Sequence, residues 1–588
     1  KNDLWLTGAV KITPMTGLTL NADYTFNTYG SGVKRHVRRY IDYKAVPGTE
    51  LPYPWTKTTS VSMRNYEDYY TAFNAFAEYE KTFNTAHYFK GMIGYNQEYK
   101  HSKNFYAARQ DLIDNDNPAI NMATGQMYMG GAETHWGIEG VFARINYSYA
   151  NKYLLEINGR YDGSSKFSTG NRYALFPSVS AAWRISEETF WSPLKEAWND
   201  MKIRASYGQL GNQVVDNLGN FPYLPTYGIN TSMDYLLGGI RPVAVSPSGL
   251  VSAGFTWETV DQMDLGFDAV LLNRLNITFD YYNRATKDML MAGQRLPSVL
   301  GTSVPQENAA DMKTKGFELS IGWIERLNNG MSYWIKGTLA DYQSEITKFA
   351  NPQGLLSTYY VGQKLGEIWG YSSGGLFQSD AEVESSPSQK KIWGGNWRAG
   401  DVKYEDLNGN GEIDYGDNTL SNSGDRKIIG NNTPRYSFGL TLGMEYKQFD
   451  FQMLWQGIGK RDYATSGVHF WGFTSEWDTP VKPALDYWTE ENRGAYFPSP
   501  NWNNGGNRQT SNRYLQDASY LRLKNVTLGY TIASSITKKL NISKIRFYLV
   551  SENPLLFTKM IKSFDPETIN NLTYPISKKY SIGFNITF

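Results

Sequence analysis

The segment with the most specific chemistry runs from Asp406 to Asp417 and reads DLNGNGEIDYGD. It follows the spacing of a twelve-residue calcium loop, with Gly411 at the sharp turn and Ile413 as the apolar anchor. Calcium takes six to eight oxygen ligands, and this spacing can bring them together. The sequence therefore predicts a Ca²⁺ site whose ligands are Asp406, Asn408, Asn410, Glu412 (through its backbone carbonyl), Asp414 and Asp417.

The last ligand position departs from the usual pattern. Asp417 is shorter than the bidentate Glu that normally closes such a loop, which predicts a weak site. No flanking helices are evident, so the site would belong to a loop and not to an EF-hand domain. The alternative is an Asn/Gly/Asp-rich turn without an ion. In either case the segment would order a long loop and would not perform catalysis.

Eight aromatic residues on two long segments, 346–433 and 461–518, form a second candidate site. Flat aromatic faces stack on sugar rings and peptides, and tryptophan is a frequent anchor at binding surfaces. The alternative is that these rings pack the loops together or against a partner protein. The candidates are Tyr359, Tyr360, Trp393, Trp397, Trp471, Trp477, Trp488 and Trp502.

The composition leaves little material for other chemistry. The chain has 588 residues, no cysteine and five histidines, which excludes thiol catalysis, disulfides and Cys-based zinc sites. No nucleophile motif or phosphate loop is present. The formal net charge is +1, whereas nucleic-acid binders normally carry a strong basic excess. We expect neither an enzyme nor a nucleic-acid-binding protein.

The elements that must position these sites are β-strands, because period-2 alternation dominates the chain. Leu18–Phe26 and Tyr580–Phe588 place apolar and polar residues on opposite faces. A change of parity in Leu521–Ile532 predicts a β-bulge near Lys524–Asn525. We predict about 17 strands and one short helix near Ser379–Glu384.

The connections between the predicted strands alternate between short and long. The long ones span about residues 27–68, 99–139, 211–257, 346–433 and 461–518. Outer-membrane barrels show this pattern, with short periplasmic turns, long extracellular loops and an aromatic-rimmed apolar face toward lipid. No run of residues is apolar enough for a transmembrane helix. The sequence therefore predicts an all-β, transmembrane antiparallel β-barrel, although a large soluble β-sandwich array would alternate similarly.

Several motifs spread over the chain resemble the SusC/RagA family, the TonB-linked outer-membrane importers of Bacteroidetes. They are Tyr161–Phe167, Phe176–Ile185, Trp257–Thr259, Lys315–Leu319, Tyr520–Tyr530, Ser551–Phe557, Phe564–Glu567 and Tyr574–Ile576. The resemblance implies a 22-stranded barrel with an N-terminal plug. Residues 1–588 are then expected to be the C-terminal barrel portion, with about 17 of those strands and without the plug.

The resemblance also implies a function and partners. It implies active import of an oligosaccharide or a peptide through the outer membrane of a Gram-negative, Bacteroidetes-like cell. A SusD-like surface lipoprotein would cover the substrate, and TonB would act through an N-terminal segment outside this chain. One alternative is a passive porin or a surface adhesin barrel. Another is a soluble β-rich carbohydrate-binding protein.

Overall fold

Strands dominate the computed structural model, which describes residues 1–38, 41–43, 51–52, 58–213, 219–230, 235–246, 249–252, 254–293, 296–302, 304–569 and 576–588. Within these residues, 17 strands belong to one sheet. Each of the 17 predicted strands overlaps one of them, so the predicted number is confirmed. They are β1 (Asn2–Met15), β2 (Leu18–Val37), β5 (Ser60–Phe83), β6 (His87–Gln110), β7 (Met127–Tyr149), β8 (Tyr153–Ser164), β9 (Tyr173–Arg184), β10 (Trp198–Asn212), β13 (Glu258–Leu271), β14 (Leu275–Ala292), β15 (Gln306–Arg326), β16 (Ser332–Phe349), β21 (Arg435–Tyr446), β22 (Phe449–Lys460), β25 (Tyr520–Thr531), β26 (Lys544–Thr558) and β27 (Lys579–Thr587).

The remaining elements are short and lie in the connections. The helices are α1 (Asp380–Ser385), which confirms the predicted helix, α2 (Val468–Trp471) and α3 (Ser534–Thr537). The small strands are β3 (Ile41–Tyr43), β4 (Leu51–Pro52), β11 (Gly228–Asn230), β12 (Ala244–Ser246), β17 (Glu367–Tyr371), β18 (Ser373–Leu376), β19 (Val402–Tyr404), β20 (Arg426–Asn431), β23 (Asp462–Ala464) and β24 (Leu515–Asp517). The described residues contain no helix of the length and hydropathy needed to cross a membrane.

Two of the predicted long loops are shorter than expected. Much of 27–68 and 99–139 is strand, because β2 continues to Val37, β5 starts at Ser60, β6 continues to Gln110 and β7 starts at Met127. The hydrophobic pattern missed these extensions because both of their faces carry polar and charged residues. The backbone hydrogen bonds of long ladders hold them instead. The predicted loops 211–257, 346–433 and 461–518 agree with the strand ends to within a few residues.

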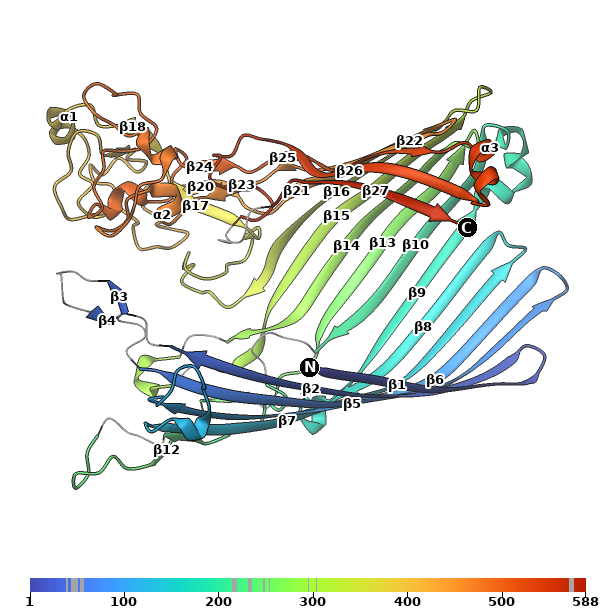
Figure 1. The fold of residues 1–588 in the computed structure, drawn as a ribbon, viewed down its shortest axis with the longest axis horizontal. Helices are drawn as coiled ribbons and strands as arrows, with labels where there is room; N and C mark the ends of the chain where they lie inside the picture. Colours follow the sequence, from blue (N-terminus) through green and yellow to red (C-terminus); the bar gives the residue numbers. More distant parts are fainter. Residues whose placement is uncertain are drawn as a thin grey trace. The chain divides into compact units, whose positions relative to one another are not determined.

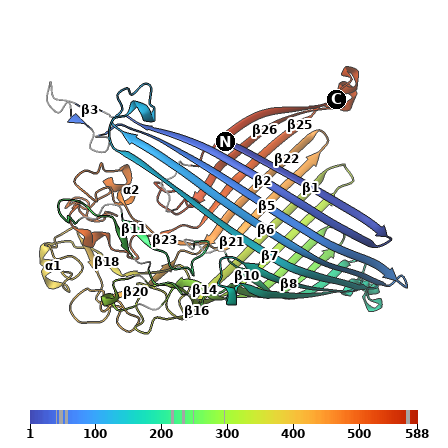
Figure 2. The same ribbon diagram turned by 90° about the horizontal axis from the view of Figure 1, so that it is seen from below.

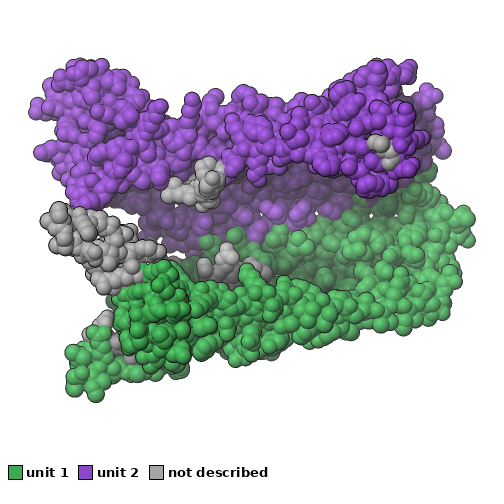
Figure 3. Space-filling view, viewed as in Figure 1, with its two compact units in different colours: residues 1–181, 207–260, 288–308 green, residues 182–206, 261–287, 309–588 purple. Residues whose placement is uncertain are grey.

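The chain divides into two compact units, which Figure 3 colours separately. Unit 1 comprises residues 1–181, 207–260 and 288–308. In it, β1, β2, β5, β6, β7 and β8 pair antiparallel, each with the next (Figures 1 and 2). The β1–β2 turn needs glycine: Gly17 has a φ of +87°, and a Cβ there would lie 2.4 Å from the backbone oxygen of Glu80.

Unit 2 comprises residues 182–206, 261–287 and 309–588. In it, β15, β16, β21, β22, β25, β26 and β27 pair antiparallel in chain order. The register of β25 shifts between Leu523 and Asn525 against both of its neighbours. This confirms the predicted bulge at Lys524–Asn525.

The apolar faces of the strands are exposed, whereas a water-soluble sheet buries them. On β8, Leu155 and Ile157 are 38% and 46% exposed, and on β25 and β26 Leu528 and Leu549 are 46% and 51% exposed. A continuous apolar surface of this kind is unfavourable in water and suits contact with lipid.

The polar faces carry hydrogen bonds that cross the strands. In unit 1, Asn74 donates to Asp23 on β2 and accepts a hydrogen bond from Asn96 on β6, at 2.8 and 2.6 Å. In unit 2, Arg546 on β26 forms an ion pair with Asp450 on β22 across Gly529 of β25. A Cβ at Gly529 would lie 2.3 Å from a carboxylate oxygen of Asp450, so glycine makes room for the pair.

Candidate functional site

The two long connections of unit 2, residues 350–433 and 461–518, fold together into what we call the loop domain. Its strands pair as β17–β20, β18–β19 and β23–β24. Residues from both connections share one hydrophobic core, so neither folds as an independent loop. That core consists of Tyr371, Leu376, Val402, Tyr404, Ile413, Phe470, Trp471, Trp488, Ala495, Phe497 and Tyr514.

Aromatic contacts organise this core around Phe470, which is fully buried. Its ring lies 5.0 Å from that of Trp471 and 5.2 Å from that of Phe497, both edge-to-face. Burial raises the pKa of Tyr371 to about 12 and that of Tyr404 well above its ordinary value. Both phenols therefore remain neutral and serve packing and hydrogen bonding, with Tyr404 donating to the carbonyl of Gly506 at 2.8 Å.

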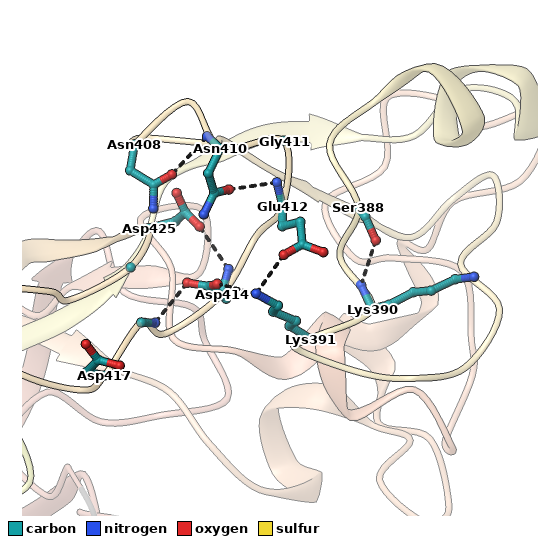
Figure 4. A network of polar contacts seen from close by, with 12 residues as sticks. Ser388, Lys390, Lys391, Asn408, Asn410, Gly411, Glu412, Asp414, Asp417 and Asp425 are labelled. Atoms are coloured by element: carbon teal, nitrogen blue, oxygen red, sulfur yellow. Dashed lines mark hydrogen bonds and ion pairs between the residues drawn. The ribbon is translucent and has the colours of Figure 1, made fainter.

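The calcium-loop segment is attached to this core by Ile413, which is fully buried as its anchoring role predicts. Gly411 has a φ of +81°, so it makes the predicted sharp turn. Asp406 accepts hydrogen bonds from the backbone N–H groups of Gly409 and Gly411, at 2.7 and 2.8 Å. Asn408 and Asn410 each accept one from the N–H group two residues further on (Figure 4).

The later ligand positions contact a lysine. The Nζ of Lys391 lies 2.6 Å from Glu412 and 3.1 Å from Asp414 (Figure 4). Partial burial favours a higher pKa for Asp414, but the N–H of Gly416 and the charge of Lys391 outweigh it and hold that pKa below its ordinary value. Asp417 accepts a hydrogen bond from the Asn422 side chain instead, at 2.9 Å.

Sequence reasoning missed two residues of this network. Lys391 comes from a preceding turn, and no motif marks it. Asp425 is fully buried and accepts hydrogen bonds from the backbone N–H groups of Leu407 and Asp414, both at 2.8 Å, which closes the loop at its base. Among the described residues, no three His, Cys, Asp or Glu side chains are grouped so as to hold a metal ion. An ion here would therefore depend on Asn and backbone oxygens.

The eight candidate aromatic residues fall into three groups. Tyr360, Trp471 and Trp488 are buried, and the last two belong to the loop-domain core. Trp393 and Trp397 are half-buried and pack edge-to-face, with ring centroids 5.9 Å apart. The rings available for contact with a ligand or a partner are those of Tyr359, Trp477 and Trp502, which are 37%, 86% and 43% exposed.

A buried ionic cluster joins β25 to the segment that follows β26. Arg522 is 3% exposed, and its guanidinium contacts the carboxylates of Asp565 and Glu567 at 2.6 and 2.5 Å. Lys524 adds a second contact to Glu567 at 2.8 Å. Phe564 of the same segment packs against the loop-domain core, so the cluster connects the membrane sheet to the loop domain.

Together, the lipid-compatible exposed faces, the polar opposite faces and the large loop domain define an outer-membrane β-sheet protein. The family model for "TonB dependent receptor-like, beta-barrel" matches residues 2–549. The chain belongs to this family and is an outer-membrane β-barrel protein of the SusC/RagA type. The expected fold class and location are confirmed, and the soluble alternative is wrong.

Individual relatives agree with this assignment. The chain is 26% identical to TonB-dependent receptor P3 of Formosa agariphila over 97% of its own length and 56% of the relative's. It is 27% identical to TonB-dependent receptor SusC of Bacteroides thetaiotaomicron over 76% of its own length and 43% of the relative's. The chain thus spans about half the length of the curated relatives it matches.

A solved structure shares the fold. The RagAB peptide transporter structure superimposes with a TM-score of 0.80 at 22% identity. The match covers 99% of this chain and 61% of that one. At this level of identity the likeness concerns the fold.

Proposed function

We propose that the chain forms the wall and the loop domain of an active outer-membrane importer that takes up an oligosaccharide or a peptide. In this proposal a SusD-like surface lipoprotein captures the substrate with the loop domain. TonB then supplies the energy for passage. The chain itself performs no covalent chemistry.

The family match over residues 2–549 is the observation that carries this proposal. The loop domain supports it, because its own core gives a folded support to the segments that carry the exposed rings of Trp477 and Trp502. Exposed aromatic side chains held in this way are suited to binding sugars or peptides and to contact with another protein. A SusC relative and the RagAB likeness support the choice of partner and of substrate classes.

The test is uptake in cells that express the complete protein. Deleting its gene should abolish uptake of one labelled substrate from a mixed panel of oligosaccharides and peptides, and complementation should restore it. Loss of TonB or collapse of the proton gradient should abolish the same uptake. A passive porin would continue to admit the substrate under those conditions, and this result would refute active import. Mass spectrometry of the detergent-solubilised complex should identify a surface lipoprotein.

We also propose that the 406–417 loop binds Ca²⁺ weakly, with Lys391 as a competing intramolecular cation. The spacing of Asp406, Asn408 and Asn410 supports an oxygen-lined site, and Lys391 contacts two of the predicted ligand residues. Bound calcium would order the loop and would have no part in a reaction.

Replacing Lys391 with methionine is expected to tighten calcium binding about three- to tenfold, because it frees the Asp414 carboxylate, a predicted ligand, and removes a positive charge beside the loop. The effect is modest because the lysine is half exposed and screened by solvent. Isothermal titration of the detergent-solubilised chain with CaCl₂ measures it. K390M is the matched control, since Lys390 makes no ion pair among the described residues. If neither the wild type nor K391M binds millimolar calcium, the segment is an ion-free turn.

A further inference from the structure

A pocket with about 240 Å³ of water-accessible space lies on the loop domain, between the segments around Trp471–Tyr487 and Phe497–Arg508. Most of its wall is apolar. Trp471 and Phe497 come from the core, and Pro480, Leu485, Pro498 and Pro500 add to the apolar wall. The polar part of the wall includes Ser499, Asn501, Asn504 and Asn507. Prolines and packed rings lose little conformational freedom when a ligand binds, so the pocket is well suited to hold one apolar side chain.

One arginine lines this pocket and forms no ion pair among the described residues, although the charge of Asp478 acts on it from nearby. The Nη1 of Arg508 donates to the backbone carbonyls of Trp502 and Phe473, at 2.9 and 3.4 Å. Among the described residues, no carboxylate forms an ion pair with Arg508, and its Nε and Nη2 donate no hydrogen bond. Partial burial of the guanidinium lowers its pKa, and the nearby negative charge of Asp478 offsets only part of that effect. A partly desolvated guanidinium binds a carboxylate more strongly than one in water does.

Acidic groups of the described residues near the pocket are already engaged, including Asp486, which accepts hydrogen bonds from the Asn492 side chain and the Tyr496 N–H group. Asp478 accepts hydrogen bonds from the backbone N–H groups of Thr474 and Ser475 and from the Thr474 hydroxyl. Asp401 is fully buried, and it accepts hydrogen bonds from the Asn507 side chain and the Arg398 N–H, at 2.7 and 3.0 Å. The unsatisfied charge at the pocket is therefore positive.

We propose that this pocket binds an apolar residue that carries a free carboxylate, as at the C-terminus of a peptide. The side chain lies between the rings and prolines, and the carboxylate accepts hydrogen bonds from Nε and Nη2 of Arg508. An oligosaccharide fits less well, because a neutral sugar has no charge for Arg508 to pair with and its hydroxyl groups would face the rings and prolines that form most of the wall. This inference goes beyond the proposed function, because it concerns binding to the loop domain and does not require transport.

The experiment compares two probes that differ in one group. N-acetyl-Ala-Leu with a free carboxylate and its C-terminal amide are titrated into the detergent-solubilised full chain, with tryptophan fluorescence or calorimetry as the readout. The acid should bind the wild type more tightly than the amide does. R508Q should weaken the acid roughly ten- to hundredfold, as expected for the loss of a charge-assisted hydrogen bond, and should leave the amide unchanged. R493Q removes an exposed arginine of the same loop and should change the affinity of neither probe.

A second variant protects the test against a folding defect in R508Q. Leu485 is 62% exposed, so L485A should fold normally while removing part of the apolar wall. L485A should weaken the binding of the acid and the binding of the amide to the same extent. The proposal would be overturned if the wild type bound acid and amide equally, or if R508Q bound the acid as tightly as the wild type does. It would also be overturned if a maltooligosaccharide displaced the acid from the wild type and bound R508Q with unchanged affinity. Failure of uptake with the binding pattern intact would count against the proposed transport function alone.

Discussion

Replacing Arg522 with leucine is expected to lower the free energy of unfolding by about 3–5 kcal/mol, the range for removing one partner of a buried ion pair. The side chain is 3% exposed. Among the described residues, the substitution leaves the carboxylate of Asp565 without an ion pair, while Glu567 keeps its contact with Lys524. The temperature at which the folded band disappears in semi-native SDS gel electrophoresis should fall accordingly.

The matched control is K579Q, which removes one partner of an exposed ion pair. Lys579 lies 3.6 Å from Glu552, and both side chains are largely open to solvent. Exposed pairs contribute little, so the gel transition should not move measurably. An equal shift in R522L and K579Q would mean that the buried cluster has no special structural role. R522L/D565L should recover part of the loss, because it removes the carboxylate whose ion pair is with Arg522, whereas Glu567 keeps its contact with Lys524.

Replacing Phe470 with alanine is expected to unfold the loop domain while leaving the membrane sheet folded. Its ring is fully buried and contacts the rings of Trp471, Phe497 and Tyr514. Truncating a buried Phe to Ala typically costs about 3–5 kcal/mol, which is a large part of the stability of a small domain. Limited proteolysis should therefore cut within residues 461–518 at much lower protease concentrations.

The membrane sheet serves as the internal reference for F470A. The temperature at which the folded band of F470A disappears from the gel should remain near the wild-type value, because that band reports on the sheet. W477A is the external control: Trp477 is 86% exposed, so its loss removes almost no packing. If F470A destabilises the sheet as much as the loop domain, the two form a single cooperative unit. If F470A leaves the cleavage pattern unchanged, the aromatic core does not hold the loops together.

The strands were predictable because side-chain direction alternates with every residue. In Leu18–Phe26 each apolar side chain alternates with a polar one, and a bulge shows itself as one break in that alternation, as at Lys524–Asn525. The extensions of β5 and β6 escaped this reasoning. Both faces of their outer halves carry polar and charged residues, so the alternation is lost, and only the backbone pairing across the ladder reveals these extensions.

The candidate sites were predictable only where the chemistry is local. Gly411 and Ile413 take their expected roles because the spacing within a loop fixes them. Lys391 and Asp425 reach the same loop from other segments, which only the tertiary fold shows. No sequence motif marks Arg508 either. Only the folded loop domain shows that its guanidinium forms no ion pair among the described residues.

The length of β5 and β6 has a mechanical consequence. Each has 24 residues, so each extends for about 80 Å at about 3.3 Å per residue. Tilted by about 45°, such a strand rises about 55 Å, roughly twice the apolar band of an outer membrane, which is about 25 Å tall. If the β5–β6 turn at Asn84–Ala86 lies at the membrane face, the end that carries Ser60 and Gln110 stands about 30 Å clear of the lipid. Under that condition, the β5–β6 ribbon forms a rigid wall that extends well beyond the apolar part of the membrane.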